Sequence, residues 1–74
     1  MDIRKENKPY LPLEISGKHK KKTMVVYQCI LVAQASGWDS KAIESFLHKL
    51  NLRLSMEDFL GQISEKFNIY LIKS

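Results

Sequence analysis

The side chains best suited to chemistry in this 74-residue sequence are the basic ones of 18–22, Lys-His-Lys-Lys-Lys, which directly follow Gly17. Lysine ammonium groups neutralise phosphates and release counterions, so such a run attracts polyanions without reading a base sequence. The run lacks the first glycine and the Gly-Lys-Ser/Thr ending of a phosphate-binding P-loop. The candidate residues for binding an anion or a nucleic acid are Lys18, Lys20, Lys21 and Lys22.

The net charge of +4 is concentrated at the N-terminal end of the chain. Residues 1–22 hold seven Lys or Arg and three Asp or Glu, whereas residues 23–74 hold five of each kind. This asymmetry indicates a basic, partly flexible arm over 1–22 attached to a neutral, compact helical domain over 23–74. Such an arm favours an anionic partner, and the alternative is that it only keeps the protein soluble.

No residues have the spacing of a catalytic or metal site. Cys29 lies within the most apolar stretch, 24–33, where a thiol is normally an inert core residue. One cysteine and two histidines, His19 and His48, make neither a disulfide framework nor a zinc-finger pattern. We therefore expect a protein that is not an enzyme and that needs no metal or cofactor.

The expected compartment is the cytoplasm. The first ten residues are polar and no apolar segment follows them, so we expect no secretory signal. The apolar stretch 24–33 is about half as long as the roughly twenty residues of a membrane-spanning helix, so we expect no membrane partner. A lone thiol agrees with a reducing compartment.

Short strands are predicted near both ends of the chain. Residues 11–16 alternate apolar and polar side chains, and Pro12, which has no N–H to donate, restricts this strand to a sheet edge. Residues 69–72 predict a second strand, preceded by Asn68 in the left-handed conformation of a helix end. The second strand needs a pairing edge, which is 11–16, 52–54 or the same strand of a second chain.

Three helices are predicted between these strands. Residues 23–36 are apolar at nearly every position and too many for a strand, so we expect a helix ended by Gly37. The second helix, 40–50, has Asp39 as its N-cap. The third, 56–67, has Ser55 as its N-cap and contains Gly61, which we take to mark a close helix–helix approach. The predicted fold is a small, mostly helical α+β domain with three short helices and one or two short strands.

The last two helices also fit a helix-turn-helix interpretation, which their charges oppose. A DNA-reading helix should expose basic or neutral side chains. The 56–67 helix instead exposes Glu57, Asp58 and Glu65 against Lys66 alone. An αα-hairpin that packs a core is therefore the favoured interpretation.

The apolar 23–36 helix predicts self-association. Two partner helices cover only part of it, and soluble monomers rarely leave a large apolar patch in water. A two-fold dimer is the favoured remedy, and the alternative is that residues 11–16 fold back over the patch. The predicted interface residues are Val25, Cys29, Val32, Tyr70 and Ile72.

Two functions follow from these features. The first is a small, non-enzymatic protein-interaction module that acts as an oligomeric regulator or adaptor, with a protein partner besides itself. The alternative is a nucleic-acid-binding accessory protein that grips phosphates through its basic N-terminal arm.

Overall fold

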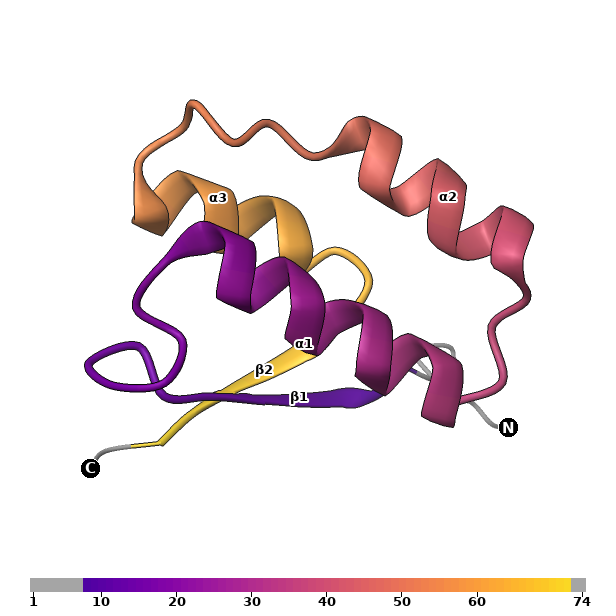
Figure 1. Ribbon diagram of the computed structural model, residues 1–74, viewed down its shortest axis with the longest axis horizontal. Helices are drawn as coiled ribbons and strands as arrows, with labels where there is room; N and C mark the ends of the chain where they lie inside the picture. Colours follow the sequence, from indigo (N-terminus) through magenta and orange to yellow (C-terminus); the bar gives the residue numbers. More distant parts are fainter. Residues whose placement is uncertain (1–7, 73–74) are drawn as a thin grey trace, which may run out of the picture.

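A computed structural model describes residues 8–72 of the protein, with the elements in the order β1, α1, α2, α3, β2 (Figure 1). The strands are β1 (Tyr10–Leu13) and β2 (Asn68–Leu71). The helices are α1 (Lys22–Ala35), α2 (Ser40–Lys49) and α3 (Met56–Ile63). The predicted fold class, a small and mostly helical α+β protein, is confirmed. No helix within residues 8–72 is long and apolar enough to cross a membrane.

The two strands form a parallel sheet, in which Tyr10 lies opposite Asn68 and the pairing continues in step to Leu13 and Leu71. Parallel neighbours need a crossover of a dozen or more residues, and here the three helices form it. Of the three pairing edges considered for the C-terminal strand, the chain uses the N-terminal one. Both strands lie where they were predicted, but β1 ends at Leu13 because a tight turn follows it.

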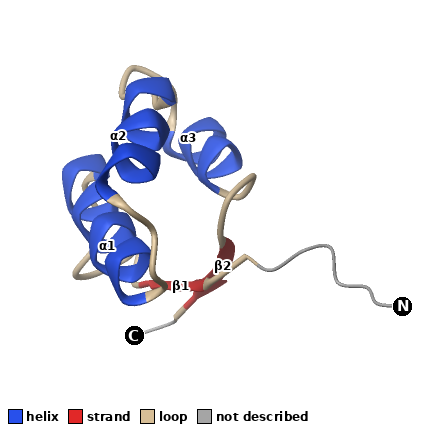
Figure 2. Cartoon of the chain, turned by 90° about the vertical axis from the view of Figure 1, so that its right-hand side faces the viewer, coloured by secondary structure: helices blue, strands red, loops and turns tan. Residues whose placement is uncertain are grey.

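All three helices lie on one side of the sheet, and no helix or strand of residues 8–72 covers its other face (Figure 2). Leu11 and Leu13 are buried in the core, together with Val25, Cys29 and Ala33 of α1, which are spaced four residues apart. The N-terminal strand therefore covers one side of α1. This is the arrangement that the sequence offered as the alternative to a dimer. The other buried apolar residues are Phe46 of α2, Phe59 and Ile63 of α3, and Phe67 before β2.

Side-chain caps begin α2 and α3, as the sequence predicted. Asp39 Oδ1 accepts a hydrogen bond of 2.8 Å from Ala42 N at the start of α2. Ser55 Oγ accepts one of 3.2 Å from Asp58 N at the start of α3. Each cap satisfies a backbone N–H that the first turn of a helix leaves without a partner.

Gly37 ends α1, which also confirms the prediction. Its φ is +92°, in the left-handed region that a side chain disfavours. Gly37 N donates to Gln34 O over 3.1 Å, and Trp38 N donates to Ala33 O over 3.0 Å. This pair of bonds is the Schellman motif, and it turns the chain toward α2.

Three predictions about α3 and the residues that follow it are wrong. The helix ends at Ile63 rather than at Phe67, and the Ser64 hydroxyl donates to Gly61 O over 2.8 Å where the chain turns. Asn68 is not left-handed, because the helix has already ended and Asn68 opens β2; no non-glycine residue within 8–72 has a positive φ. Gly61 marks no close approach, since a Cβ there would meet no other part of the structure within 4 Å.

Replacing the glycines by alanine tests these backbone assignments. Gly61→Ala should raise the free energy of unfolding by about 0.5–1 kcal/mol, because Gly61 is an exposed helical position with open space around it. Gly37→Ala is the matched control, and its left-handed backbone should make it less stable by about 1–2 kcal/mol. Urea unfolding of both variants measures these effects. A Gly61→Ala variant less stable than the parent would contradict the open helical position.

Candidate binding surfaces

The predicted lysine run begins in a closed turn after β1 and ends at Lys22, the first residue of α1. Glu14 O accepts hydrogen bonds from Gly17 N over 3.0 Å and from His19 N over 2.8 Å. The His19 ring is buried, and its Nδ1 accepts a hydrogen bond of 2.9 Å from Glu14 N. His19 therefore holds the turn from inside, whereas its neighbours Lys18 and Lys20 are exposed. The sequence pattern placed His19 among the lysines and gave no sign of this structural role.

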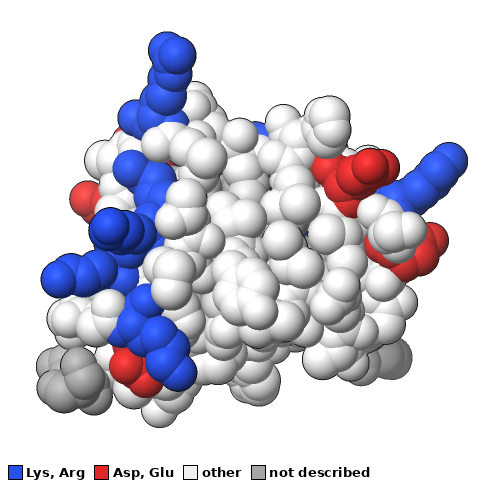
Figure 3. All heavy atoms as spheres, viewed as in Figure 1, with Lys and Arg blue, Asp and Glu red and all other residues white. Residues whose placement is uncertain are grey.

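The fold brings the lysines next to the loop that precedes α3. Lys20, Lys21 and Lys22 line a shallow hollow of about 490 Å³ together with Leu52 and Met56. Arg53, in the same loop, is exposed. Figure 3 shows Lys and Arg gathered along the left-hand edge of the molecule, where these two loops lie. We call Lys18, Lys20, Lys21, Lys22 and Arg53 the basic edge.

The outer side of α1 forms an apolar surface with no charge. Met24, Tyr27 and Leu31 are exposed by 42, 60 and 43% and are spaced i, i+3 and i+7, so they share one side of the helix. No charged residue occurs between Lys22 and Asp39. Figure 3 shows the result, a face without Lys, Arg, Asp or Glu at its centre, over α1. We call the surface of Met24, Tyr27 and Leu31 the α1 face.

The five residues predicted for an oligomer interface differ in where they lie and in how exposed they are. Val25 and Cys29 are buried inside the core of the single chain, so they are not available on its surface. Val32 and Ile72 are half-buried, and Tyr70 is 63% exposed on β2. The sequence could not tell the inner side of α1 from its outer side, because both are apolar.

The face of the sheet away from the helices, which we call the outer face of the sheet, is mainly apolar. Tyr10 is 76% exposed on β1, and Tyr70 is exposed on β2 opposite Pro12. Side chains alternate along a strand, so these residues point away from Leu11 and Leu13, which lie in the core. The protein thus presents two separate apolar surfaces, the α1 face and the outer face of the sheet.

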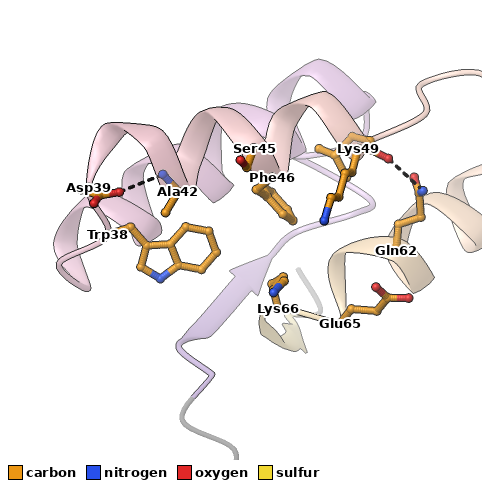
Figure 4. Close-up of a pocket in the computed structure, with 10 residues that line it drawn as sticks. Trp38, Asp39, Ala42, Ser45, Phe46, Lys49, Gln62, Glu65 and Lys66 are labelled. Atoms are coloured by element: carbon orange, nitrogen blue, oxygen red, sulfur yellow. Dashed lines mark hydrogen bonds between the residues drawn. The ribbon is translucent and has the colours of Figure 1, made fainter.

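A cleft of about 510 Å³ lies between α2 and the turn that follows α3 (Figure 4). The rings of Trp38 and Phe46 line it, with Lys49 of α2 and Lys66 of the turn on its two sides. Trp38 stacks on Phe67 at 5.2 Å and meets Phe46 edge-on at 5.8 Å. The sequence indicated no such cleft, because it forms only when segments distant along the chain meet.

The end of α2 is tied to α3 beside this cleft. Gln62 Nε2 donates to Lys49 O over 3.1 Å, the contact drawn in Figure 4, and Gln62 Oε1 accepts from Asn51 N over 2.9 Å. Asp39, on the opposite side, already accepts the hydrogen bond that caps α2. The side chains of Gln62 and Asp39 therefore hold the walls of the cleft in place.

No known protein family, curated protein or solved structure matches this chain. Within residues 8–72, no group of three or more His, Cys, Asp or Glu side chains could hold a metal ion. The candidate sites are therefore surfaces defined by shape, charge and exposure: the basic edge, the α1 face, the outer face of the sheet and the cleft.

Burial of Cys29 makes the stability of the protein depend on pH above about 9. Burial raises the pKa of its thiol from 9.0 to about 12, because the core disfavours the thiolate. Between these values the unfolded chain releases a proton that the folded chain keeps, so the free energy of unfolding should fall by about 1.4 kcal/mol per pH unit from this group. Below pH 9 its contribution should be constant.

Urea unfolding at several pH values, compared with Cys29→Ala, isolates this effect. Every ionisable group except the thiol is present in both proteins, so the difference between them reports Cys29 alone. Equal pH dependence of the two proteins above pH 9 would show that the thiol is not buried in the folded chain.

Proposed function

We propose that this chain is a small protein-interaction module that docks another protein on the α1 face. The observation that carries the proposal is an exposed helix with no charge after Lys22 and three large apolar side chains turned to solvent. The centres of protein interfaces are depleted of charge and enriched in Tyr and Met, as this face is. Apolar anchors at i, i+3 and i+7 are typical of a helix that docks into a groove.

The α1 face is supported by a rigid base. The inner side of α1 is buried through Val25, Cys29 and Ala33. Gln28 Nε2 also donates to Pro12 O over 3.2 Å, which ties the helix to β1. A surface that is already ordered loses less conformational entropy when it binds, which favours affinity. The base therefore supports a docking role for α1.

We propose specifically that the protein is an oligomeric regulator or adaptor in the cytoplasm. Such a protein acts by bringing partners together, and a chain with several separate binding surfaces suits that role. The lone buried thiol agrees with a reducing compartment.

Nucleic-acid binding through the basic edge is the second candidate function. It is favoured by the hollow that gathers Lys20, Lys21 and Lys22, since clustered lysines attract phosphates. Glu57 and Asp58 directly follow Met56, which lines the same hollow, and their carboxylates weaken the attraction. We place it second for this reason.

Charge placed on the α1 face should abolish partner binding. In an affinity pull-down from the native host, Leu31→Glu should lose the proteins that the parent retains, because the interface would bury an unpaired carboxylate. Leu52→Glu is the matched control for the α1 face, since Leu52 is 50% exposed but lines the hollow beside the lysines. It should keep every partner that docks on the α1 face and weaken only partners that the basic edge attracts. Both variants should unfold in urea like the parent, because both side chains already contact water.

Nuclease treatment separates the two candidate functions. Partners that resist nuclease, are lost with Leu31→Glu and are kept with Leu52→Glu support docking on the α1 face. Partners that disappear with nuclease support the basic edge instead. A set of retained proteins that is the same for the parent and both variants would contradict the proposed function.

A further inference from the structure

The outer edge of β2 is open for strand pairing. The ladder bonds at the two ends of the sheet run from Asn68 N to Pro9 O and from Ile72 N to Leu13 O, both 2.8 Å long. Backbone groups alternate in direction along a strand, so the even-numbered β2 residues face β1. The N–H and C=O groups of residues 69 and 71 point to the other edge, where no strand of residues 8–72 lies.

The corresponding edge of β1 is closed by three features. Pro12, whose backbone groups face that edge, has no N–H. Its carbonyl oxygen already accepts a hydrogen bond of 3.2 Å from Gln28 Nε2 of α1. Glu14 N, the next group on the same edge, donates to His19 Nδ1 over 2.9 Å. Within residues 8–72 one edge of the sheet is thus blocked and the other is free, although natural proteins usually protect exposed edges.

We propose that β2 pairs antiparallel with β2 of a second copy of this chain, about a two-fold axis at Tyr70. In this register Ile69 lies opposite Leu71 of the second copy, and the reverse pair follows by symmetry. The two pairs exchange four hydrogen bonds, which use every outward backbone group of residues 69 and 71. The inference rests on the self-association included in the proposed function, and it needs no contact through the α1 face.

The strand is suited to pairing with itself. Its residues, Asn-Ile-Tyr-Leu-Ile over 68–72, carry no charge, so the register places no like-charged side chains opposite one another within this segment. The register brings the exposed ring of Tyr70 against Tyr70 of the second copy. It also places Leu71, which is 57% exposed, against Ile69 of that copy. Aromatic and aliphatic cross-strand pairs of this kind stabilise antiparallel sheets.

The closed edge of β1 limits the assembly to two chains. The dimer would hold a four-stranded sheet in the order β1, β2, β2, β1, and both of its outer edges would be blocked by Pro12 and Gln28. Edge pairing that cannot continue yields a closed dimer rather than a fibre. In Figure 2, α1 lies beside β1 rather than beside β2, so pairing at the outer edge of β2 would leave both α1 faces free for partners.

Hydrogen exchange of the parent protein tests the pairing through single amides. The amides of residues 68 and 72 should exchange slowly at every concentration, because they bond to β1 within one chain. Those of Ile69 and Leu71 should exchange slowly only at concentrations where light scattering shows a dimer, and rapidly after dilution. Rapid exchange at residues 69 and 71 in a sample that is dimeric would place the interface elsewhere and overturn the inference.

A proline variant supplies the second test. Leu71→Pro removes an outward N–H but no bond within the chain, so it should fold and remain a monomer at concentrations where the parent is a dimer. Leu71→Ala is the matched control: it loses the same side chain, keeps the N–H and should remain a dimer. A dimeric Leu71→Pro, or a parent that is monomeric at all concentrations, would overturn the inference. Docking on the α1 face would stand in either case, because the Leu31→Glu pull-down measures it separately.

Discussion

The parallel pairing of β1 with β2 is the contact on which the rest of the structure depends. It joins strands from opposite ends of the chain, and a parallel pair can be connected only by a crossover. The three helices form that crossover, so they all lie on the same side of the sheet (Figure 2). Leu11 and Leu13 then enter the core beside α1, which gives this short chain a buried centre.

The surfaces available for binding follow from the same arrangement. No helix of the described part of the chain covers the outer face of the sheet, and α1 has only one of its two apolar sides against the core. Gln28 holds α1 to the carbonyl of Pro12 and closes the edge of β1, whereas no strand within residues 8–72 covers the edge of β2. Large apolar side chains therefore remain in water both on α1 and on the sheet.

Local signals made much of the fold predictable. Asp39, Ser55 and Gly37 set helix boundaries through contacts with near neighbours in the sequence, and these boundaries are confirmed. Features that depend on distant parts of the chain were not predictable. Because α1 is apolar all round, no pattern showed which side is inward. His19 looked like part of a solvated basic run, although its ring is buried in the turn. Residues 1–7 of the predicted arm lie outside the described residues.

The most direct test is whether the N-terminal strand is part of the core. Leu13 is fully buried beside α1, so Leu13→Ala should lower the free energy of unfolding by about 2–5 kcal/mol. Leu52→Ala, at a side chain that is half exposed, should change it by about 0.5 kcal/mol or less. Urea unfolding of the two variants beside the parent makes the comparison. A Leu13→Ala protein as stable as Leu52→Ala would show that β1 does not hold the fold together.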